Sequence, residues 1–346
     1  MSNQSYALRV IPGYTASMPG VQIGTQIPAD APDEALAFAR QLGVEWVMTS
    51  VPSGGDHSAS GYRRVVERFA DAGLKVYRLA NDSCHNMDAV TLGLEGRDAK
   101  IDEYLGYLRN LSEAGIRYAT YAHMANGIWH SDREPIRGGA DARAFRLSEP
   151  NYGRWREARY QGTLTHERVY SEAELWEHYE YFIRRVVPVA EELGVYIGIH
   201  PDDPPVAELG GIPRCIFGSY DGYVRALEIA DSTNIGVCLC VGCWLEGGEQ
   251  MGVDVVEAIR SFAAAGKLFK VHLRNVTAPL PQGFAETFLD DGYGDMPNIL
   301  QALVDSGFDG AVISDHRPNM VGGRYAAEAY AVGYIRAALQ SAQHRR

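Results

Sequence analysis

The sequence predicts a (β/α)8 barrel in a single domain over residues 1–346. Short apolar runs of strand length alternate with longer segments whose apolar residues recur three and four positions apart, as in an amphipathic helix. Six of the runs follow a glycine that closes the preceding helical segment, as in QLGVEW and ELGVYI. Alternating strands and helices without hairpin signals are typical of a parallel sheet, and 346 residues suffice to close such a sheet into a barrel.

Eight runs are expected to form the barrel wall. Each is rich in aliphatic, β-branched or aromatic residues, which favour strands. In chain order they are YALRVIP from residue 6, GVEWVMTS from 43, GLKVYRLA from 73, GIRYATYA from 115, GVYIGIH from 194, NIGVCLCVG from 234, KLFKVHLRN from 267 and GAVISDH from 310.

Eight segments with helical periodicity are expected to cover this wall. In chain order they are DEALAFARQL from residue 33, GYRRVVERFADA from 61, KIDEYLGYLRNLSEA from 100, LWEHYEYFIRRVVPVAEEL from 175, YDGYVRALEIAD from 220, VDVVEAIRSFAAA from 253, MPNILQALVDS from 296 and YAAEAYAVGYIRAALQ from 325. The alternative is an open doubly wound sheet, which calls for a GxGxxG turn after the first strand; the chain has IPGYTASMPG there.

One connection is much longer than the others and runs from about residue 122 to 170. It is rich in Arg, Gly and Trp. Its length indicates a lid or a subunit contact over the barrel mouth, and a surface excursion without a function is the alternative.

Composition and charge exclude several classes of protein. The formal net charge of −12 argues against binding to nucleic acid or to an anionic membrane, because both attract clustered Lys and Arg. The start MSNQSYALRVIPGY lacks the features of a signal peptide or membrane span, so a cytoplasmic location is expected. Five cysteines are too few, and odd in number, for a disulfide framework.

Titratable residues stand at the carboxyl ends of four successive strands, where the active sites of such barrels lie. The fifth strand ends at His200, the sixth at Cys240, the seventh at His272 and the eighth at Asp315. Neighbouring parallel strands are about 4.8 Å apart, so four inward side chains at matched height can converge on one ion. We expect a divalent-metal site, whereas each residue taken singly has a purely structural interpretation.

Two choices at this site stay open. Cys238 alternates onto the same face as Cys240, which we prefer because it is nearer the mouth, and Cys243 is expected in the following loop. The thiolate favours Zn²⁺ or Fe²⁺, whereas imidazole and carboxylate also suit Mn²⁺.

Residues beside the ligands complete the predicted site. Arg274 is expected to clamp a carboxylate, with a rim salt bridge as the alternative, and Asn275 to hydrogen-bond a hydroxyl group. His316 is a candidate acid or base. In GIHPDDPP the prolines are expected to hold the loop so that His200 and Asp202 or Asp203 keep their direction.

Several of these motifs together resemble one family. HPDDPP followed by GGIPR, NIGVCLCVG, HLRNV, the SDH of the last strand and LGLEGRDAKIDEYLGYLRNLSEAGI are similar to the mannonate dehydratase (UxuA-type) family of xylose-isomerase-like TIM barrels. The resemblance covers about residues 90 to 340.

This resemblance implies a metal-dependent elimination of water from a sugar acid, giving a 2-keto-3-deoxy acid. It implies Mn²⁺ or Fe²⁺ held by His200, Cys240, His272 and Asp315. It also implies acid and base roles for His316 and Tyr330, without deciding which is the base. The expected partner is a small sugar acid, together with further copies of the chain in a homo-oligomer.

The chain also departs from the family pattern, at positions expected near the barrel mouth. Ala285 and Leu289 replace histidines, Ile313 and Ser314 replace an Arg-Pro pair, and HMANGIWHS introduces His123, a candidate substrate contact. A sugar acid other than D-mannonate is therefore an open possibility. The alternatives are a metal-dependent sugar isomerase or epimerase and a non-catalytic sugar-acid binding protein.

Overall fold

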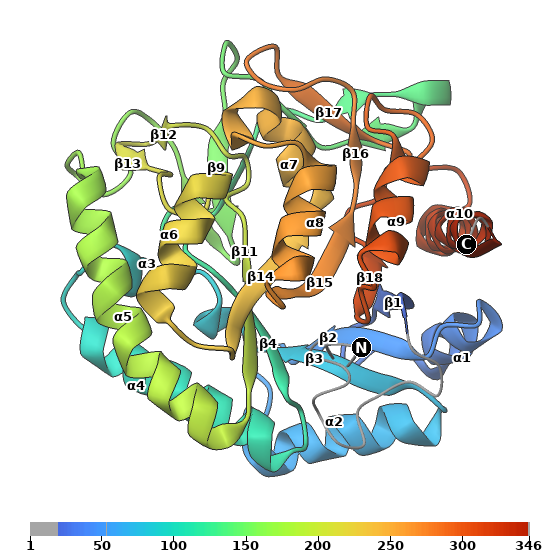
Figure 1. Ribbon diagram of the computed structural model, residues 1–346, viewed down its shortest axis with the longest axis horizontal. Coiled ribbons are helices and arrows are strands. Elements are labelled where there is room, and N and C mark those ends of the chain that lie inside the picture. The colour runs from blue at the N-terminus through green and yellow to red at the C-terminus, as the bar shows by residue number, and fades with distance from the viewer. Residues whose placement is uncertain (1–19, 53, 345–346) are drawn as a thin grey trace.

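The protein forms a nearly closed barrel of eight parallel strands, described by a computed structural model over residues 20–52 and 54–344 (Figure 1). The strand order is β3-β2-β1-β18-β15-β14-β11-β4. The two end strands lie next to each other, and Asn86 after β3 forms a parallel bridge with Ala122 of β4. The expected fold is confirmed. The strand bounds are β1 Gln22–Gln26, β2 Trp46–Ser50, β3 Lys75–Ala80, β4 Tyr118–Ala122, β11 Tyr196–His200, β14 Ile235–Cys240, β15 Leu268–Leu273 and β18 Ala311–Ser314.

Helices cover the outside of the barrel, and polar caps begin several of them. Ser58, Ser219 and Asp254 each accept a hydrogen bond from a backbone N–H of the first helical turn, and Ser171 forms a capping box with Glu174. The bounds are α1 Asp33–Gln41, α2 Ala59–Asp71, α3 Asp88–Thr91, α4 Arg97–Glu113, α5 Glu172–Leu193, α6 Tyr220–Ala230, α7 Val241–Gly247, α8 Val255–Ala264, α9 Met296–Asp305 and α10 Gly323–His344.

The first barrel strand differs from the one predicted. The run YALRVIP lies outside the described residues, and the strand that pairs with both β2 and β18 is Gln22–Gln26. Its sequence, QIGTQ, contains a single large aliphatic residue, so hydrophobic periodicity does not reveal it.

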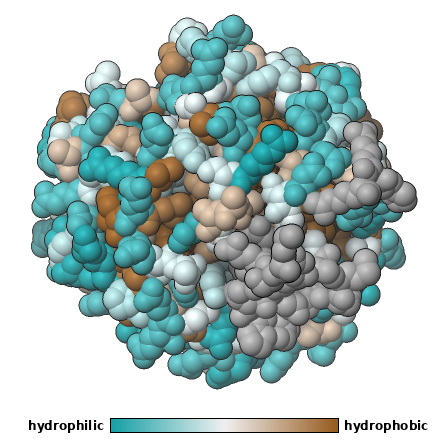
Figure 2. All heavy atoms as spheres, viewed as in Figure 1, coloured by the Kyte–Doolittle hydropathy of each residue, from teal (hydrophilic) through white to brown (hydrophobic). Residues whose placement is uncertain are grey.

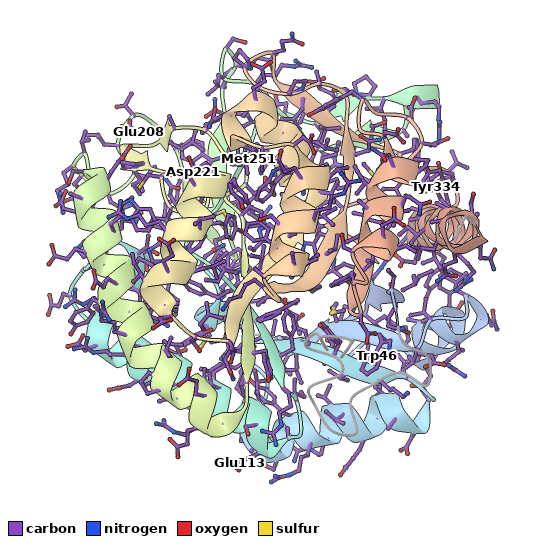
Figure 3. All side chains as sticks on the ribbon, in the orientation of Figure 1. Trp46, Glu113, Glu208, Asp221, Met251 and Tyr334 are labelled. Atoms are coloured by element: carbon purple, nitrogen blue, oxygen red, sulfur yellow. The ribbon has the colours of Figure 1, made fainter. Side chains whose placement is uncertain are left out.

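The connections after β4, β11 and β15 gather at one end of the barrel, at the top of the view in Figure 1. Glu208, just beyond β11, lies near this end in Figure 3, and Glu113, just before β4, lies at the opposite end. The small strands in these connections are β5 Ile128–His130, β6 Glu134–Pro135, β7 Asp141–Ala142, β8 Ala144–Phe145, β9 Tyr152–Trp155, β10 Ala158–Tyr160, β12 Glu208–Leu209, β13 Ile212–Pro213, β16 Asn275–Val276 and β17 Phe284–Thr287.

The long β4–α5 segment, residues 123–171, is anchored across the mouth. Its strand β8 pairs with β17, and Asp141 forms a bridge with Asn319 after β18. The segment therefore joins connections that follow three different barrel strands.

The core has two layers. One packs between the barrel and the helices, and the other fills the lower half of the barrel interior. Hydrophilic residues predominate among the described residues on the face shown in Figure 2. None of the described helices has the length and apolar character needed to cross a membrane. We call the interior layer the ring layer, formed by Trp46, Met48, Tyr77, Tyr118, Phe269, Ala311 and Ile313.

Candidate active site

Four side chains from four adjacent strands converge inside the upper barrel. His200 ends β11, Cys240 ends β14 and His272 lies near the end of β15. Asp315 follows β18 directly. One potential ligand atom of each lies within 4.8 Å of those of the other three, and all four residues are buried. The structure thus brings the four expected ligands together, while their binding of a metal stays a prediction.

Strand register explains this convergence. Cys240 and His272 are lateral partners, and His272 also pairs with Ile313, two residues before Asp315. Lateral partners in a parallel sheet point to the same face, as do residues two apart along a strand. All these side chains therefore point into the barrel.

The two imidazole rings each offer a ring nitrogen that could bind a cation. Nδ1 of His200 lies 2.8 Å from the carbonyl oxygen of Pro201 and donates to it, which leaves the lone pair on Nε2 free. The ring centroids of His200 and His272 are 5.0 Å apart. Nδ1 of His272 is buried, has no hydrogen-bond partner among the described residues and lies 3.4 Å from Oδ1 of Asp315. An orphaned ring nitrogen beside a carboxylate fits a divalent cation.

Electrostatics keep the two acidic donors anionic. Burial alone would raise the pKa of the Asp315 carboxyl group, but the charge of His316 and other cations holds it well below its usual value. Burial would also raise the pKa of the Cys240 thiol, but a hydrogen bond with Cys243 and neighbouring positive charge hold it well below its usual value. A thiolate and a carboxylate beside two imidazoles form a donor set typical of a transition metal.

The structure distinguishes the three nearby cysteines. Cys240 belongs to the four-donor group, and its Sγ lies 3.8 Å from Oδ2 of Asp315. Cys238 lies one step deeper, with its Sγ 3.5 Å from Nε2 of His272. Cys243, expected in a loop, lies instead in the short helix α7.

Arg274 is surrounded by groups of the protein in this structure, including Asp315 and His316 of the site. Its side chain has no exposed surface, so it has no room for a substrate carboxylate in this structure. The carboxylates that it binds belong to the protein itself and come from four different segments. Its guanidinium nitrogens lie 3.3 Å from Asp203, 2.6 Å from Glu246, 3.1 Å from Glu286 and 3.1 Å from Asp315.

Arg143, from the β4–α5 segment, binds three of the same carboxylates. Its guanidinium lies 2.7 Å from Asp203, 3.2 Å from Glu246 and 2.7 Å from Glu286. Sequence reasoning missed Arg143 and Glu246, because neither lies at a strand end or in a recognisable motif. Together the two arginines and three acids form a buried network directly behind the four-donor group.

Asn275 and Asp202 also contact or belong to loops of the protein in this structure. The Nδ2 atom of Asn275 donates to the carbonyl oxygens of Leu289 and Gly294, and its Oδ1 accepts from the backbone of Gly294. Asp202 is buried, and desolvation raises its pKa to about 6 although Arg214 opposes this shift. Asn275 thus shapes the connection after β15, and Asp202 lies within the HPDDPP loop.

His316 faces an open cleft. Its side chain is 35% exposed, and its Nδ1 lies 2.7 Å from Oε1 of Glu286. Nη1 of Arg274, which can only donate, lies 2.9 Å from the same nitrogen, so Nδ1 stands between an acceptor carboxylate and a donor guanidinium. The cleft has a volume of 710 Å³, and its lining includes Asp315, His316, Glu286 and Arg143.

Tyr330 and His123 lie away from the four-donor group. The hydroxyl group of Tyr330 donates to Asp290, and its ring packs edge-on against Phe288 at 5.5 Å. His123 packs against the rings of Tyr179 and Phe217, in the layer between barrel and helices. Burial lowers the pKa of His123 to about 3, so it is a neutral ring in apolar surroundings.

The positions that depart from the family pattern are not all at the mouth. Ala285 is buried in β17, opposite Ala144 of the long segment, and Leu289 is buried just after β17. Ile313 belongs to the ring layer below the four-donor group, which corrects the expectation that it lies near the mouth.

Comparison with known proteins places this arrangement in a family. The model of the family described as D-mannonate dehydratase (UxuA) matches residues 34–342, which is most of the chain. The chain belongs to the D-mannonate dehydratase family. Mannonate dehydratase of Streptococcus uberis is 30% identical over 292 residues, which are 79% of this chain and 82% of that protein. Mannonate dehydratase 2 of Halalkalibacterium halodurans is 30% identical over 245 residues, which are 66% of this chain and 70% of that protein.

Solved structures agree with the D-mannonate dehydratase family in fold. The crystal structure of mannonate dehydratase from Streptococcus suis serotype 2 matches with a TM-score of 0.80 and 23% identity, over 94% of this chain and 95% of that one. A structure of L-ribulose 3-epimerase matches with a TM-score of 0.59 and 16% identity, over 94% of this chain and 96% of that one. At these identities the likeness shows the xylose-isomerase-like TIM barrel and no more.

Membership of the D-mannonate dehydratase family confirms the expected resemblance and the expected class of enzyme, a carbon–oxygen lyase. It also supports a dehydratase that acts on a sugar acid. It gives no support to the isomerase, epimerase or binding-protein alternatives, which rested on the superfamily alone.

Proposed function

We propose that this protein removes water from D-mannonate, or from an aldonic acid closely related to it, and releases a 2-keto-3-deoxy acid. The observation that carries the proposal is the convergence of His200, Cys240, His272 and Asp315 beside the cleft that His316 faces. Membership of the family supports the reaction type.

The reaction needs two proton transfers. A base takes the proton from C2, next to the carboxylate, and an acid protonates the hydroxyl group that leaves C3 as water. The resulting enol then becomes the 2-keto-3-deoxy acid, so no oxidant or reductant is consumed.

His316 is proposed to carry out one of these transfers from the cleft. We propose that its Nδ1–H donates to Glu286, beside Nη1 of Arg274, and that Nε2 is the atom that accepts or delivers the proton. Burial alone would raise the pKa of Glu286, but the positive charges of Arg143, His316 and Arg274 lower it to about 2. Glu286 therefore stays anionic and holds the His316 ring in place.

We propose that Mn²⁺ or Fe²⁺, with Zn²⁺ as a further possibility, is held by His200, Cys240, His272 and Asp315. The orphaned Nδ1 of His272 and the anionic state of Cys240 and Asp315 fit such an ion. When bound, a divalent metal supplies a Lewis acid that stabilises negative charge developing on the substrate.

Tyr330 is the proposed second proton-transfer group. Its hydroxyl group is bonded to Asp290 in this structure, and burial with the nearby Asp290 carboxylate raises its pKa to about 12. A hydroxyl group with this pKa stays protonated and can act as an acid.

A screen of hexonic and pentonic acids with added Mn²⁺ under reducing conditions tests the proposal. We expect a 2-keto-3-deoxy acid from D-mannonate or from a close stereoisomer. Dehydration of another sugar acid alone would keep the reaction type and replace the substrate. Absence of a keto acid from every sugar acid, with metal bound, would overturn the proposed function.

A further inference from the structure

Lys270 is a buried cation inside the barrel, one layer below the four-donor group. It lies two residues before His272 on β15, so both side chains point to the same face. Its lateral partners are Cys238 on β14 and Ala311 on β18, and Ala311 belongs to the ring layer. The residue is only 1% exposed.

Arg78 is a second cation on the interior face, contributed by β3. Its lateral partner on β2 is Met48, which belongs to the ring layer. The residue before it, Tyr77, crosses the barrel and donates from its hydroxyl group to the carbonyl oxygen of Phe269 at 2.6 Å. Phe269 immediately precedes Lys270, so Arg78 and Lys270 stand on opposite walls above the same layer of rings.

Neither cation forms an ion pair or hydrogen bond with a carboxylate among the residues that the structure describes, and the acidic groups nearest the Lys270 ammonium are those of Cys238, Asp315 and Cys240. No ion pair or hydrogen bond of the Arg78 guanidinium or the Lys270 ammonium is found within residues 20–52 and 54–344, and Nε of Arg78 is buried without an acceptor. The sequence of residues 1–19 contains no Asp or Glu. Arg274, in contrast, binds four carboxylates of the protein. Lys270 is almost fully buried and Arg78 is partly exposed, and two cations that face the same interior without a carboxylate ion pair form a site suited to an anion from outside.

Polar groups without hydrogen-bond partners lie in the connection that follows β3, the strand of Arg78. Asn86 is a lateral partner of Ala122, which is in turn a lateral partner of His200, so the Asn86 side chain faces the same side as His200. Asn86 is 8% exposed, and both of its amide atoms lack hydrogen-bond partners among the described residues.

His85 adds a neutral ring at the same place. Its Nδ1 is buried without a partner, and Trp155 of the β4–α5 segment stacks on it at 4.9 Å. Burial, followed by the positive charge of Arg78 and then of His200, holds the pKa of His85 well below its usual value. His85 therefore stays neutral and can donate or accept a hydrogen bond.

We infer that Arg78 and Lys270 bind the carboxylate group of the sugar acid, and that Asn86 and His85 hydrogen-bond its hydroxyl groups. The inference rests on the proposed function for the identity of the ligand. It assigns to Arg78 and Lys270 the role that the sequence suggested for Arg274. Charge-assisted contacts from two sides also favour the extra negative charge that the carboxylate carries as its α-proton leaves.

Equilibrium binding to Mn²⁺-loaded protein tests this subsite. His316→Asn serves as the background, so that turnover does not disturb titration with D-mannonate. We expect Arg78→Met and Lys270→Met each to weaken D-mannonate binding by about 10- to 100-fold, the loss of one charge-assisted contact. Binding of the neutral polyol D-mannitol should change less than about threefold, since it carries no charge for either cation to contact.

Matched controls separate the subsite from general charge effects. Lys75→Met removes an exposed cation from the same strand β3, and Arg109→Met removes an exposed one from α4, so both should leave D-mannonate binding unchanged. Lys270→Met should not lower the melting temperature by more than a few degrees, because the Lys270 ammonium forms no ion pair or hydrogen bond with a carboxylate of the described residues. Should a Met variant not fold, Arg78→Gln and Lys270→Gln provide the same comparison.

The outcomes separate this inference from the proposed function. Equal weakening for D-mannonate and D-mannitol, unchanged D-mannonate binding, or loss of bound Mn²⁺ in the variants would overturn the carboxylate subsite. Charge-selective weakening without dehydration of any sugar acid by the unmodified protein would keep the subsite and overturn the dehydratase. If the unmodified protein dehydrates D-mannonate and both variants bind it with full affinity, the dehydratase would stand and the carboxylate subsite would be overturned.

Discussion

Nδ1 of His316 lies 2.7 Å from Oε1 of Glu286, in front of the two buried arginines Arg143 and Arg274. The pair joins the loop after β18 to β17, a strand that itself pairs with the β4–α5 segment. The direction of the proposed proton-transfer group is therefore set by three connections together.

Substitution of Glu286 tests this arrangement. We expect Glu286→Gln to lower kcat by about 100-fold or more, because an amide can accept or donate and no longer fixes the proton on Nδ1 of His316. Initial rates with the best sugar acid provide the measurement, and the exposed Glu249→Gln serves as the control. A change in KM alone would contradict the assignment.

The ligand cysteine can be identified by metal analysis. We expect Cys240→Ser to lose most of its bound metal in elemental analysis of protein purified with Mn²⁺, since a serine hydroxyl is a far poorer anionic donor. Cys238→Ser should retain close to one ion per chain. The opposite pattern would move the ligand to Cys238, and full retention in both variants would refute a cysteine ligand.

Removal of one hydroxyl group tests Tyr330. We expect Tyr330→Phe to lower kcat by about 100-fold, the typical contribution of an acid or base, while the melting temperature stays nearly constant. Tyr334→Phe is the matched control, because Tyr334 lies one helical turn further along α10 (Figure 3) and stacks on Tyr330 at 6.5 Å. If kcat of Tyr330→Phe falls by less than threefold, Tyr330 is not a proton-transfer group and its role is packing alone.

The buried network predicts a large effect on stability. Arg143→Met leaves Asp203, Glu246 and Glu286 with one fewer cation, and we expect it to lower the free energy of unfolding by about 3–5 kcal/mol. Urea unfolding followed by circular dichroism measures the change. Arg154→Met, on the exposed side of β9, should change it by less than about 0.5 kcal/mol. If the two variants have equal free energies of unfolding, the Arg143 ion pairs make no net contribution to stability.

Much of the fold could be predicted because hydrophobic periodicity and glycine turns act locally. Seven of the eight predicted strands coincide with barrel strands, and the exception involves Gln22–Gln26, whose polar residues hide its place in the sheet. The convergence of the four proposed ligands followed from one rule, that parallel strands end at the same edge of a barrel.

The surroundings of the site could not be predicted in the same way. Arg274 has the chemistry to bind a substrate carboxylate, but Glu246 and Asp203 reach it from segments whose approach no local pattern encodes. The sequence does show Lys270 in KVHLR and Arg78 in KVYRLA, as charged residues inside two predicted strands that also carry His272 and Lys75. The homo-oligomer and the cytoplasmic location stay predictions.

The hydrogen bond from the Tyr77 hydroxyl group to the carbonyl oxygen of Phe269 has a consequence for how small molecules enter and leave the barrel. Together with the rings around it, this bond fills the lower barrel among the described residues, so the four-donor group is reached from the end that the β4–α5 segment covers. On the proposed function, the sugar acid and the keto acid would then pass through the same end of the barrel. We therefore expect the product to inhibit competitively. In a product-rich solution we expect turnover to be limited by the exchange of product for substrate at this end of the barrel.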